Sequence, residues 1–258
     1  MATFLFDDII FGPVKSRRFG VSLGVNLLPD NYKFCTFNCV YCECGWTYKN
    51  NAEKIKLPNR SDIQKNLEIK LQQMTKEGKP PDNITFAGNG EPTVHPKFSE
   101  IIDDTISLRN FYFPDAEITV LSNASMLHKQ KVFEALRKVD NNVLKLDTAV
   151  DDTFSLINIP TSGISLEKTI QGIKNFKGDQ IIQTLFIKGE YKGVSFDNTH
   201  PDELNALFTV LKEIAPRYVM VYSIERDTAL NSLEKIPESK LNSIVEMMMD
   251  NGINAKMY

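Results

Sequence analysis

The sequence predicts an α/β fold whose mainly parallel sheet forms a partial (β/α)6 barrel. Three observations support this prediction: short apolar β-like runs alternate with longer segments of helical spacing, about six such pairs occur, and turn-forming residues interrupt them. Strands separated by helices favour a parallel sheet of right-handed βα units. Six units suit an open or partial barrel better than a complete eightfold one. Because no clear linker or repeat breaks the pattern, residues 1–258 are interpreted as one domain.

The predicted elements follow in order along the chain. A strand at residues 19–28 is ended by Pro29-Asp30-Asn31, and a helix begins at Ser61-Asp62 and ends at Gly78. Apolar residues recur along that helix at helical spacing: Ile63, Leu67, Leu71 and Met74. Later strands are expected at residues 84–87, 118–121, 143–147, 181–187 and 218–224. Later helices are expected after Pro96 and at residues 129–138, 165–176, 201–214 and 239–250, before a short C-terminal tail. Residues 49–60 lack an apolar period and are expected to form an exposed excursion.

The composition is that of an ordinary globular protein. Hydrophobic residues make up 42% of the 258 residues and charged residues 24%, with a net charge of -3. With this net charge, the protein does not attract nucleic acid through its overall electrostatic field, although local basic patches can still bind phosphates. No apolar run of eighteen residues predicts a membrane span, and no signal-peptide pattern begins the chain. The expected compartment is therefore the cytoplasm, with no membrane partner.

All four cysteines lie in one short segment, between Cys35 and Cys44. Cysteines that cross-link a fold would be spread along it, so clustering favours metal binding. Cys35, Cys39 and Cys42 have the spacing C-x3-C-x2-C, and thiolates are the usual ligands of a [4Fe-4S] cluster. Three thiolates would leave one of the four irons open to a small ligand. The alternative is structural zinc with Cys44 as a fourth ligand, but Cys42 and Cys44 are spaced tightly for a chelating pair.

The cysteine spacing, with the aromatic Tyr41 before the third cysteine, resembles the signature of the radical S-adenosylmethionine (radical SAM) superfamily. The resemblance implies a partial (β/α)6 radical SAM barrel and a [4Fe-4S] cluster whose open iron binds S-adenosylmethionine. It also implies reductive cleavage of that cofactor to a 5'-deoxyadenosyl radical, which abstracts hydrogen from a substrate. Tyr41 would then pack near the adenine, and a flavodoxin or ferredoxin would supply electrons.

Polar residues at the ends of predicted strands fit this resemblance, because ligands of βα barrels bind at those ends. Gly88-Asn89-Gly90-Glu91-Pro92 resembles the superfamily's Gly-Gly-Glu-Pro motif, which contacts the methionyl amine. Asp147, in a Lys-x-Asp pattern with Lys145, resembles a strand of glycyl-radical activating enzymes. The predicted cofactor-binding residues are Tyr41, Gly88, Asn89, Gly90, Glu91, Ser122, Asn123, Asp147 and Gln183. A strand-to-helix turn and helix caps are the alternative explanations for these motifs.

The catalytic residues are unknown from the sequence, and three candidates stand out. Arg226 follows a strand and can grip a carboxylate or phosphate bidentately, although a surface ion pair is its simpler role. Lys145 can point into the barrel or out to solvent. Cys44 can be a reactive thiol or a bystander.

A narrower resemblance covers nearly the whole chain. Residues 16–29 (SRRFGVSLGVNLLP) lead into the cysteine segment, which ends with Cys42-Glu43-Cys44-Gly45. This pattern resembles a compact, largely uncharacterised radical SAM family, and it implies no substrate.

Three functional hypotheses therefore remain. The first is radical modification of RNA or another large molecule, because residues 49–79 carry eight Lys or Arg against four Asp or Glu and aromatic residues surround the cysteines. The second is activation of a glycyl-radical protein. The third is a zinc-stabilised binding module without catalysis. RNA, protein and small-molecule substrates all stay open, as do the oligomeric state and the fate of the cofactor.

Overall fold

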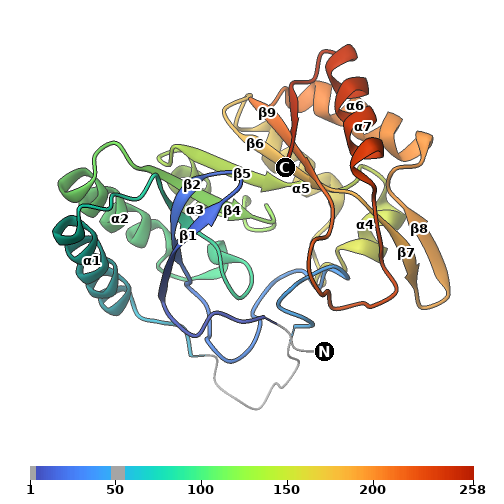
Figure 1. Ribbon diagram of the computed structural model, residues 1–258. Coiled ribbons are helices and arrows are strands. Elements are labelled where there is room, and N and C mark those ends of the chain that lie inside the picture. The colour runs from blue at the N-terminus through green and yellow to red at the C-terminus, as the bar shows by residue number, and fades with distance from the viewer. Residues whose placement is uncertain (1–3, 48–55) are drawn as a thin grey trace.

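The computed structural model describes residues 4–47 and 56–258 and has the predicted α/β fold (Figure 1). Within these residues one sheet has eight strands in the order β1-β2-β3-β4-β5-β6-β9-β11. All neighbours pair in parallel except β1 and β2, which form an antiparallel hairpin. The strands are β1 (Ile10–Ser16), β2 (Gly20–Val25), β3 (Asn83–Phe86), β4 (Glu117–Ser122), β5 (Asn141–Lys145), β6 (Ile181–Leu185), β9 (Tyr218–Tyr222) and β11 (Ala255–Met257).

Helices flank this sheet, with α1 and α2 side by side near its N-terminal edge and α6 and α7 at the other end of the molecule (Figure 1). The helices are α1 (Arg60–Glu77), α2 (Phe98–Tyr112), α3 (Gln130–Leu136), α4 (Asp151–Ile157), α5 (Leu166–Lys174), α6 (Pro201–Ile214) and α7 (Glu238–Asp250). A 3-10 turn (Pro92–Val94) follows β3. A separate small sheet contains β7 (Ile187–Tyr191), β8 (Val194–Asp197) and β10 (Glu234–Lys235). None of the helices in the described ranges is long and apolar enough to cross a membrane.

The predicted strands form the centre of the sheet because their apolar runs are buried. Every residue of β3 and of β6 is buried, as expected for the inner strands of a parallel sheet. The apolar stripe predicted for α1 is also its buried face: Ile63, Leu67, Leu71 and Met74. Asn59 caps this helix by accepting a hydrogen bond from the amide of Asp62 (2.9 Å), and Gly78 ends it in a left-handed conformation.

The structure adds elements that the sequence did not predict. β1 was missed because most of its residues are exposed or half-buried, which leaves no apolar alternation to detect. The expected C-terminal tail is the short parallel strand β11, which pairs with β9. The predicted strand at residues 181–187 divides into β6 and the start of β7. The expected excursion at residues 49–60 lies mostly outside the described residues, and Arg60 already belongs to α1.

The segment that carries the cysteines follows β2 and is held from two sides. On one side, the amide of Phe34 donates to the carbonyl of Asn89 (2.8 Å) and the amide of Glu91 donates to the carbonyl of Phe34 (3.2 Å). On the other side, the amide of Val40 donates to the carbonyl of Ile157 at the end of α4 (2.9 Å). These backbone bonds fix the cysteine segment against the carboxyl end of β3 and against α4.

Glycine is required where the cysteine segment meets β3. Gly90 has φ +145°, and a Cβ atom built there would overlap the carbonyl oxygen of Phe34. Gly88 has φ +156°, and its Cβ would overlap the side-chain amide of Asn26. Both glycines therefore allow a backbone approach that no other residue permits.

We predict that Gly90→Ala lowers the free energy of unfolding by about 3 kcal/mol, because the added methyl group displaces the Phe34 carbonyl. Gly193→Ala is the matched control: Gly193 also has a positive φ (+78°), but no atom lies within 4 Å of the place that an added Cβ would take. The control should cost about 1 kcal/mol from backbone strain alone. Urea unfolding followed by circular dichroism measures both, and equal losses would contradict the importance of this contact.

Candidate functional site

The buried cation Lys33 interacts electrostatically with all three cysteines of the spaced motif. The Lys33 side chain is 3% exposed and its Nζ donates to the carbonyl of Gly45 (3.1 Å). Burial acts to lower the pKa of Lys33, but the charges of Cys42, Cys39 and Cys35 raise it, and the net direction is upward. The segment therefore brings three thiols and one positive charge together.

The pKa values of the four thiols are shifted in different directions. Burial raises the pKa of Cys35 to about 12 and also raises that of Cys39, although Lys33 opposes both effects. The pKa of Cys42 falls to about 5, mainly because of a hydrogen bond with Cys44, with burial acting in the opposite direction. The same contact raises the pKa of Cys44, whose Sγ also lies 3.6 Å from the carbonyl oxygen of Gly88.

This donor set fits an iron–sulfur cluster. Thiolates are the usual cluster ligands, and two of the sulfurs accept hydrogen bonds from amide side chains, Cys35 from Asn123 and Cys39 from Asn158 (both 3.6 Å). In the described ranges, no three His, Cys, Asp or Glu side chains converge on the position of a single metal ion. Cysteines that hold a cubane bind different irons, so they need not converge in that way.

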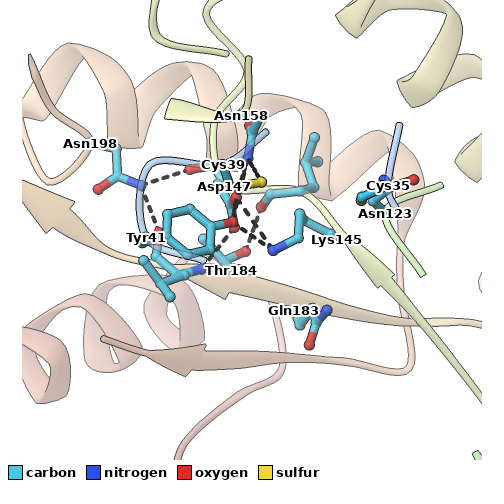
Figure 2. A network of polar contacts seen from close by, with 12 residues as sticks. Cys35, Cys39, Tyr41, Asn123, Lys145, Asp147, Asn158, Gln183, Thr184 and Asn198 are labelled. Carbon is cyan, nitrogen blue, oxygen red and sulfur yellow. Dashed lines mark hydrogen bonds and ion pairs between the residues drawn. The ribbon is translucent and has the colours of Figure 1, made fainter. Parts of the chain in front are cut away.

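Tyr41 and Asp147 meet in a buried polar network beside the cysteines (Figure 2). The Tyr41 hydroxyl donates to Asp147 Oδ2 and accepts from Lys145 Nζ (2.6 Å), while Lys145 and Asp147 form an ion pair at 3.8 Å. Asn158 donates to the same carboxylate oxygen (2.7 Å), and the amide of Leu185 donates to Oδ1 (3.0 Å). The Asp147 side chain is fully buried and that of Lys145 is 14% exposed, so Lys145 points into the fold. Although burial disfavours its charged form, the charge of Asp147 and neighbouring groups raises the pKa of Lys145.

Glu91 joins the ends of β3 and β4. Its Oε1 accepts hydrogen bonds from Ser122 Oγ (2.8 Å) and from the amide (3.1 Å) and hydroxyl of Thr93, and its Oε2 accepts from the amide of Asn123 (2.6 Å). Burial raises the pKa of Glu91, and these donors act in the opposite direction. Oε1 is saturated by three donors, whereas Oε2 has one and keeps acceptor capacity for a ligand.

Asn89 has a structural task in this arrangement. It is completely buried, and its side chain exchanges two hydrogen bonds with the backbone of Phe6 (both 2.9 Å) and donates to the carbonyl of Pro29 (2.7 Å). Both donors of the side-chain amide are thereby used within the protein. Asn89 fastens the N-terminal segment to the exit of β3.

The remaining candidates lie around a cavity of 410 Å³ that Tyr41 also lines. Gln183, in the middle of β6, accepts a hydrogen bond from Arg18 (3.3 Å), which lines the cavity. Arg226 lines the cavity and forms an exposed ion pair with Glu43 of the cysteine segment (3.0 Å). Arg226 therefore forms the surface ion pair that was considered as its simpler role. Its partner, Glu43, follows Cys42 in the sequence.

The structure identifies site residues that the sequence did not single out. Lys33 stands two residues before Cys35, and that proximity was its only available signal. Asn158 contacts Cys39 and Asp147. It lies 119 residues from Cys39 in the sequence and belongs to no recognisable motif. Asn198 donates to the carbonyls of Asp147 (3.0 Å) and Leu185 (2.8 Å), again from a distant part of the chain.

Comparison with known proteins gives a consistent result. The family model of the radical SAM superfamily matches residues 32–191. A UPF0026 protein of Helicobacter pylori is 32% identical over 239 residues, which cover 90% of this chain and 71% of that protein. A protein named GTPase Obg from Brachyspira hyodysenteriae is 28% identical over 236 residues, 90% of this chain. That match spans only 32% of the Brachyspira protein. The match to a UPF0026 protein of Methanocaldococcus jannaschii spans 54% of that protein.

Solved structures with the same fold have low sequence identity. A radical SAM methyltransferase from Sphaerobacter thermophilus superposes with a TM-score of 0.68 at 14% identity, covering 92% of this chain and 65% of that one. TYW1 with a bound lysine–pyruvate adduct superposes with a TM-score of 0.62 at 14% identity, covering 89% and 73%.

We predict that Asp147→Asn costs about 3–5 kcal/mol of stability, because it leaves the Lys145 charge buried without a counterion. Lys145→Met should cost less, about 1–2 kcal/mol, because Asp147 keeps three other donors in Tyr41, Asn158 and Leu185. The double variant should cost less than the sum of the two. Urea unfolding of the four proteins gives this double-mutant cycle.

Lys188→Met is the control, since Lys188 forms an exposed ion pair with Glu234 and should change stability by less than about 1 kcal/mol. Additive costs for Lys145 and Asp147, or a larger loss for Lys145→Met, would contradict the network.

Proposed function

This chain belongs to the radical SAM superfamily and, within it, to the family of UPF0026 proteins, and from that membership we propose how its residues divide the work. The chain is a radical SAM enzyme, and the superfamily implies a [4Fe-4S] cluster and S-adenosylmethionine. We propose that Cys35, Cys39 and Cys42 hold the cluster. The same family match favours an enzyme over the zinc-stabilised binding module.

One observation carries this proposal: three thiols of one segment interact with the buried Lys33 ammonium, and the sulfurs of Cys35 and Cys39 accept hydrogen bonds from Asn123 and Asn158. A positive charge at that place stabilises thiolates and a cluster of negative charge. A cluster held by these cysteines would supply the electron for reductive cleavage of S-adenosylmethionine, the chemistry that the superfamily implies. The chain's own residues then have to bind the cofactor, orient it and exclude water.

The proposed cofactor residues lie at the ends of neighbouring parallel strands. Gly90 keeps the backbone close to Phe34, and Oε2 of Glu91 has acceptor capacity for an ammonium group. Ser122 and Asn123 share the Glu91 carboxylate and follow the next strand. We assign these groups to the methionyl part of the cofactor.

Tyr41 and Asp147 are proposed for the adenosyl part. Their hydrogen bond, together with Lys145, fixes the Tyr41 ring next to the cysteines. Because this network is buried, it excludes water from the place where a radical must survive until it meets substrate. Lys145, Cys44 and Arg226 remain the candidates for contact with substrate, and a flavodoxin or ferredoxin remains the proposed electron donor.

Among the substrate hypotheses, modification of RNA is favoured by the position of two arginines. Arg17 and Arg18 line the same cavity as Tyr41, so a basic cluster lies next to the proposed active site. The other basic segment, residues 49–79, lies partly outside the described residues. No feature of the described residues favours activation of a glycyl-radical protein in the same way.

The cysteine assignment predicts a clear difference between two alanine variants. After anaerobic reconstitution, the wild-type chain and Cys44→Ala should each hold about four irons, because Cys44 lies outside the motif. Cys39→Ala should lose most of the iron together with the visible absorption of the cluster. Iron and sulfide analysis with absorption spectra measures this, and dithionite with S-adenosylmethionine then tests for 5'-deoxyadenosine.

Circular dichroism of each variant reports whether the fold is kept. The proposal fails if a folded Cys39→Ala still forms 5'-deoxyadenosine, or if the wild-type chain binds one zinc and no iron.

A further inference from the structure

The 410 Å³ cavity beside Tyr41 lies where both edges of the sheet contribute to one wall. Lys15 and Ser16 belong to the edge strand β1, and Tyr258 follows the opposite edge strand β11. The end of β9 supplies Tyr222, and the cysteine segment supplies Tyr41 and Glu43. The volume lies in the range of small-molecule sites, which extends from about 300 to 1,000 Å³.

The charges around this cavity do not balance. Four cationic side chains line it, and the only carboxylate side chains among its lining residues are Glu43 and Glu225. Arg226 pairs with Glu43 at 3.0 Å, while Glu225 is shared between Arg17 (3.9 Å) and Lys235 (2.7 Å). Lys15 and Arg18 form no ion pair within the described residues. The cavity therefore carries an excess of positive charge in a chain whose net charge is -3.

Of the two cations without an ion pair among the described residues, Arg18 gives the stronger evidence for an anion site. It is half-buried, and its guanidinium lies 5.6 Å from the centre of the Tyr222 ring and 5.5 Å from that of Phe19. One nitrogen donates to Gln183 (3.3 Å), and a guanidinium has five donors in all. The rings hold its plane in place while most donors stay available for an anion.

The other walls are aromatic. Phe6 and Phe11 stack with ring centroids 3.7 Å apart, and Tyr41 and Tyr222 line the side nearest the cysteines. Aromatic faces of this kind bind planar rings, and cations beside them bind the anionic group that such a ring carries.

We propose that this cavity binds the substrate of the enzyme through a phosphate monoester attached to a planar ring, as in a nucleoside monophosphate. A phosphate monoester carries about two negative charges at neutral pH, which matches the two cations without ion pairs. Lys15 and Arg18 bind the phosphate and the aromatic walls bind the ring. This assignment rests on the proposed function, because it names the substrate class of the same active site.

The cavity is suited to substrate and not to the cofactor. Of the residues proposed to contact S-adenosylmethionine, only Tyr41 lines it. The cofactor carries a sulfonium and an ammonium group with one carboxylate, so a cation-rich cavity repels it. Sharing Tyr41 places the substrate ring next to the adenosyl part of the cofactor, where the radical is produced.

The test measures ligand binding by the reconstituted enzyme with saturating S-adenosylmethionine and no reductant. Each of the four ribonucleoside 5'-monophosphates is titrated calorimetrically, and the four nucleosides without phosphate serve as comparison ligands. We expect at least one monophosphate to bind tenfold or more tightly than its nucleoside. Lys15→Gln and Arg18→Gln should each weaken that binding about tenfold, the usual effect of losing a charged hydrogen bond.

Lys240→Gln is the matched control variant, because Lys240 is an exposed lysine that lines a different cavity. Its affinity should equal that of the wild-type enzyme. Lys15 is exposed and forms no ion pair with any residue that the structure describes, so Lys15→Gln tests the idea even if Arg18→Gln does not fold. A second titration compares a short RNA that carries a 5'-phosphate with the same RNA that carries a 5'-hydroxyl. Binding that depends on Lys15 supports the proposal in either titration. Such binding in the first titration identifies a free nucleotide as the ligand, and in the second it identifies an RNA end.

The proposal is overturned if phosphate adds nothing to affinity in both titrations, or if Lys15→Gln binds like Lys240→Gln. The wild-type iron content and 5'-deoxyadenosine formation without substrate are measured on the same preparation. A preparation that makes 5'-deoxyadenosine but ignores phosphate refutes this inference alone, whereas one that makes none refutes the proposed function.

Discussion

The buried carboxylate of Asp147 is the constraint on which the site depends. A charge that is fully removed from water is tolerated only where donors surround it, and here the donors come from four separate parts of the chain. Tyr41 belongs to the cysteine segment, Lys145 to β5, Asn158 to the end of α4 and Leu185 to β6. Satisfying this one group therefore requires that the cysteine segment be folded onto the carboxyl ends of the strands.

Glu91 repeats the same principle on the other side of the cysteines. Each carboxylate is linked through an asparagine to a sulfur: Glu91 through Asn123 to Cys35, and Asp147 through Asn158 to Cys39. Hydrogen bonds to sulfur are one of the ways in which a protein adjusts an iron–sulfur cluster. The strand ends thus control the surroundings of the sulfurs as well as their positions, and Lys33 adds a fixed charge behind them.

The sequence predicted those parts of the fold that depend on local pattern. The apolar runs of β3, β4, β5, β6 and β9 and the buried stripe of α1 follow from periodicity, and the cysteines follow from spacing. The hairpin strand β1 is mostly exposed and β11 has three residues, so neither leaves a periodic signal. The roles of Asn158 and Lys33 could not be predicted for a different reason: they arise only from contacts that tertiary folding creates. For Lys145 the sequence left two orientations open, and the Asp147 charge decides between them.

The N-terminal segment has a consequence for cooperativity. Phe4 and Phe6 form part of the cavity wall, and Phe6 is tied to the rest of the protein by two hydrogen bonds with the Asn89 side chain. Phe4 adds one through its amide to the carbonyl of Glu43 (3.1 Å). The ring of Phe6 also stacks on that of Phe11, so the wall is attached both to the hairpin and to the exit of β3. The backbone of Asn89 meanwhile accepts the bond from Phe34 that closes the cysteine segment. If a ligand that fills the cavity orders this wall, its binding and closure of the cysteine segment are linked equilibria, and the coupling free energy is the same in both directions.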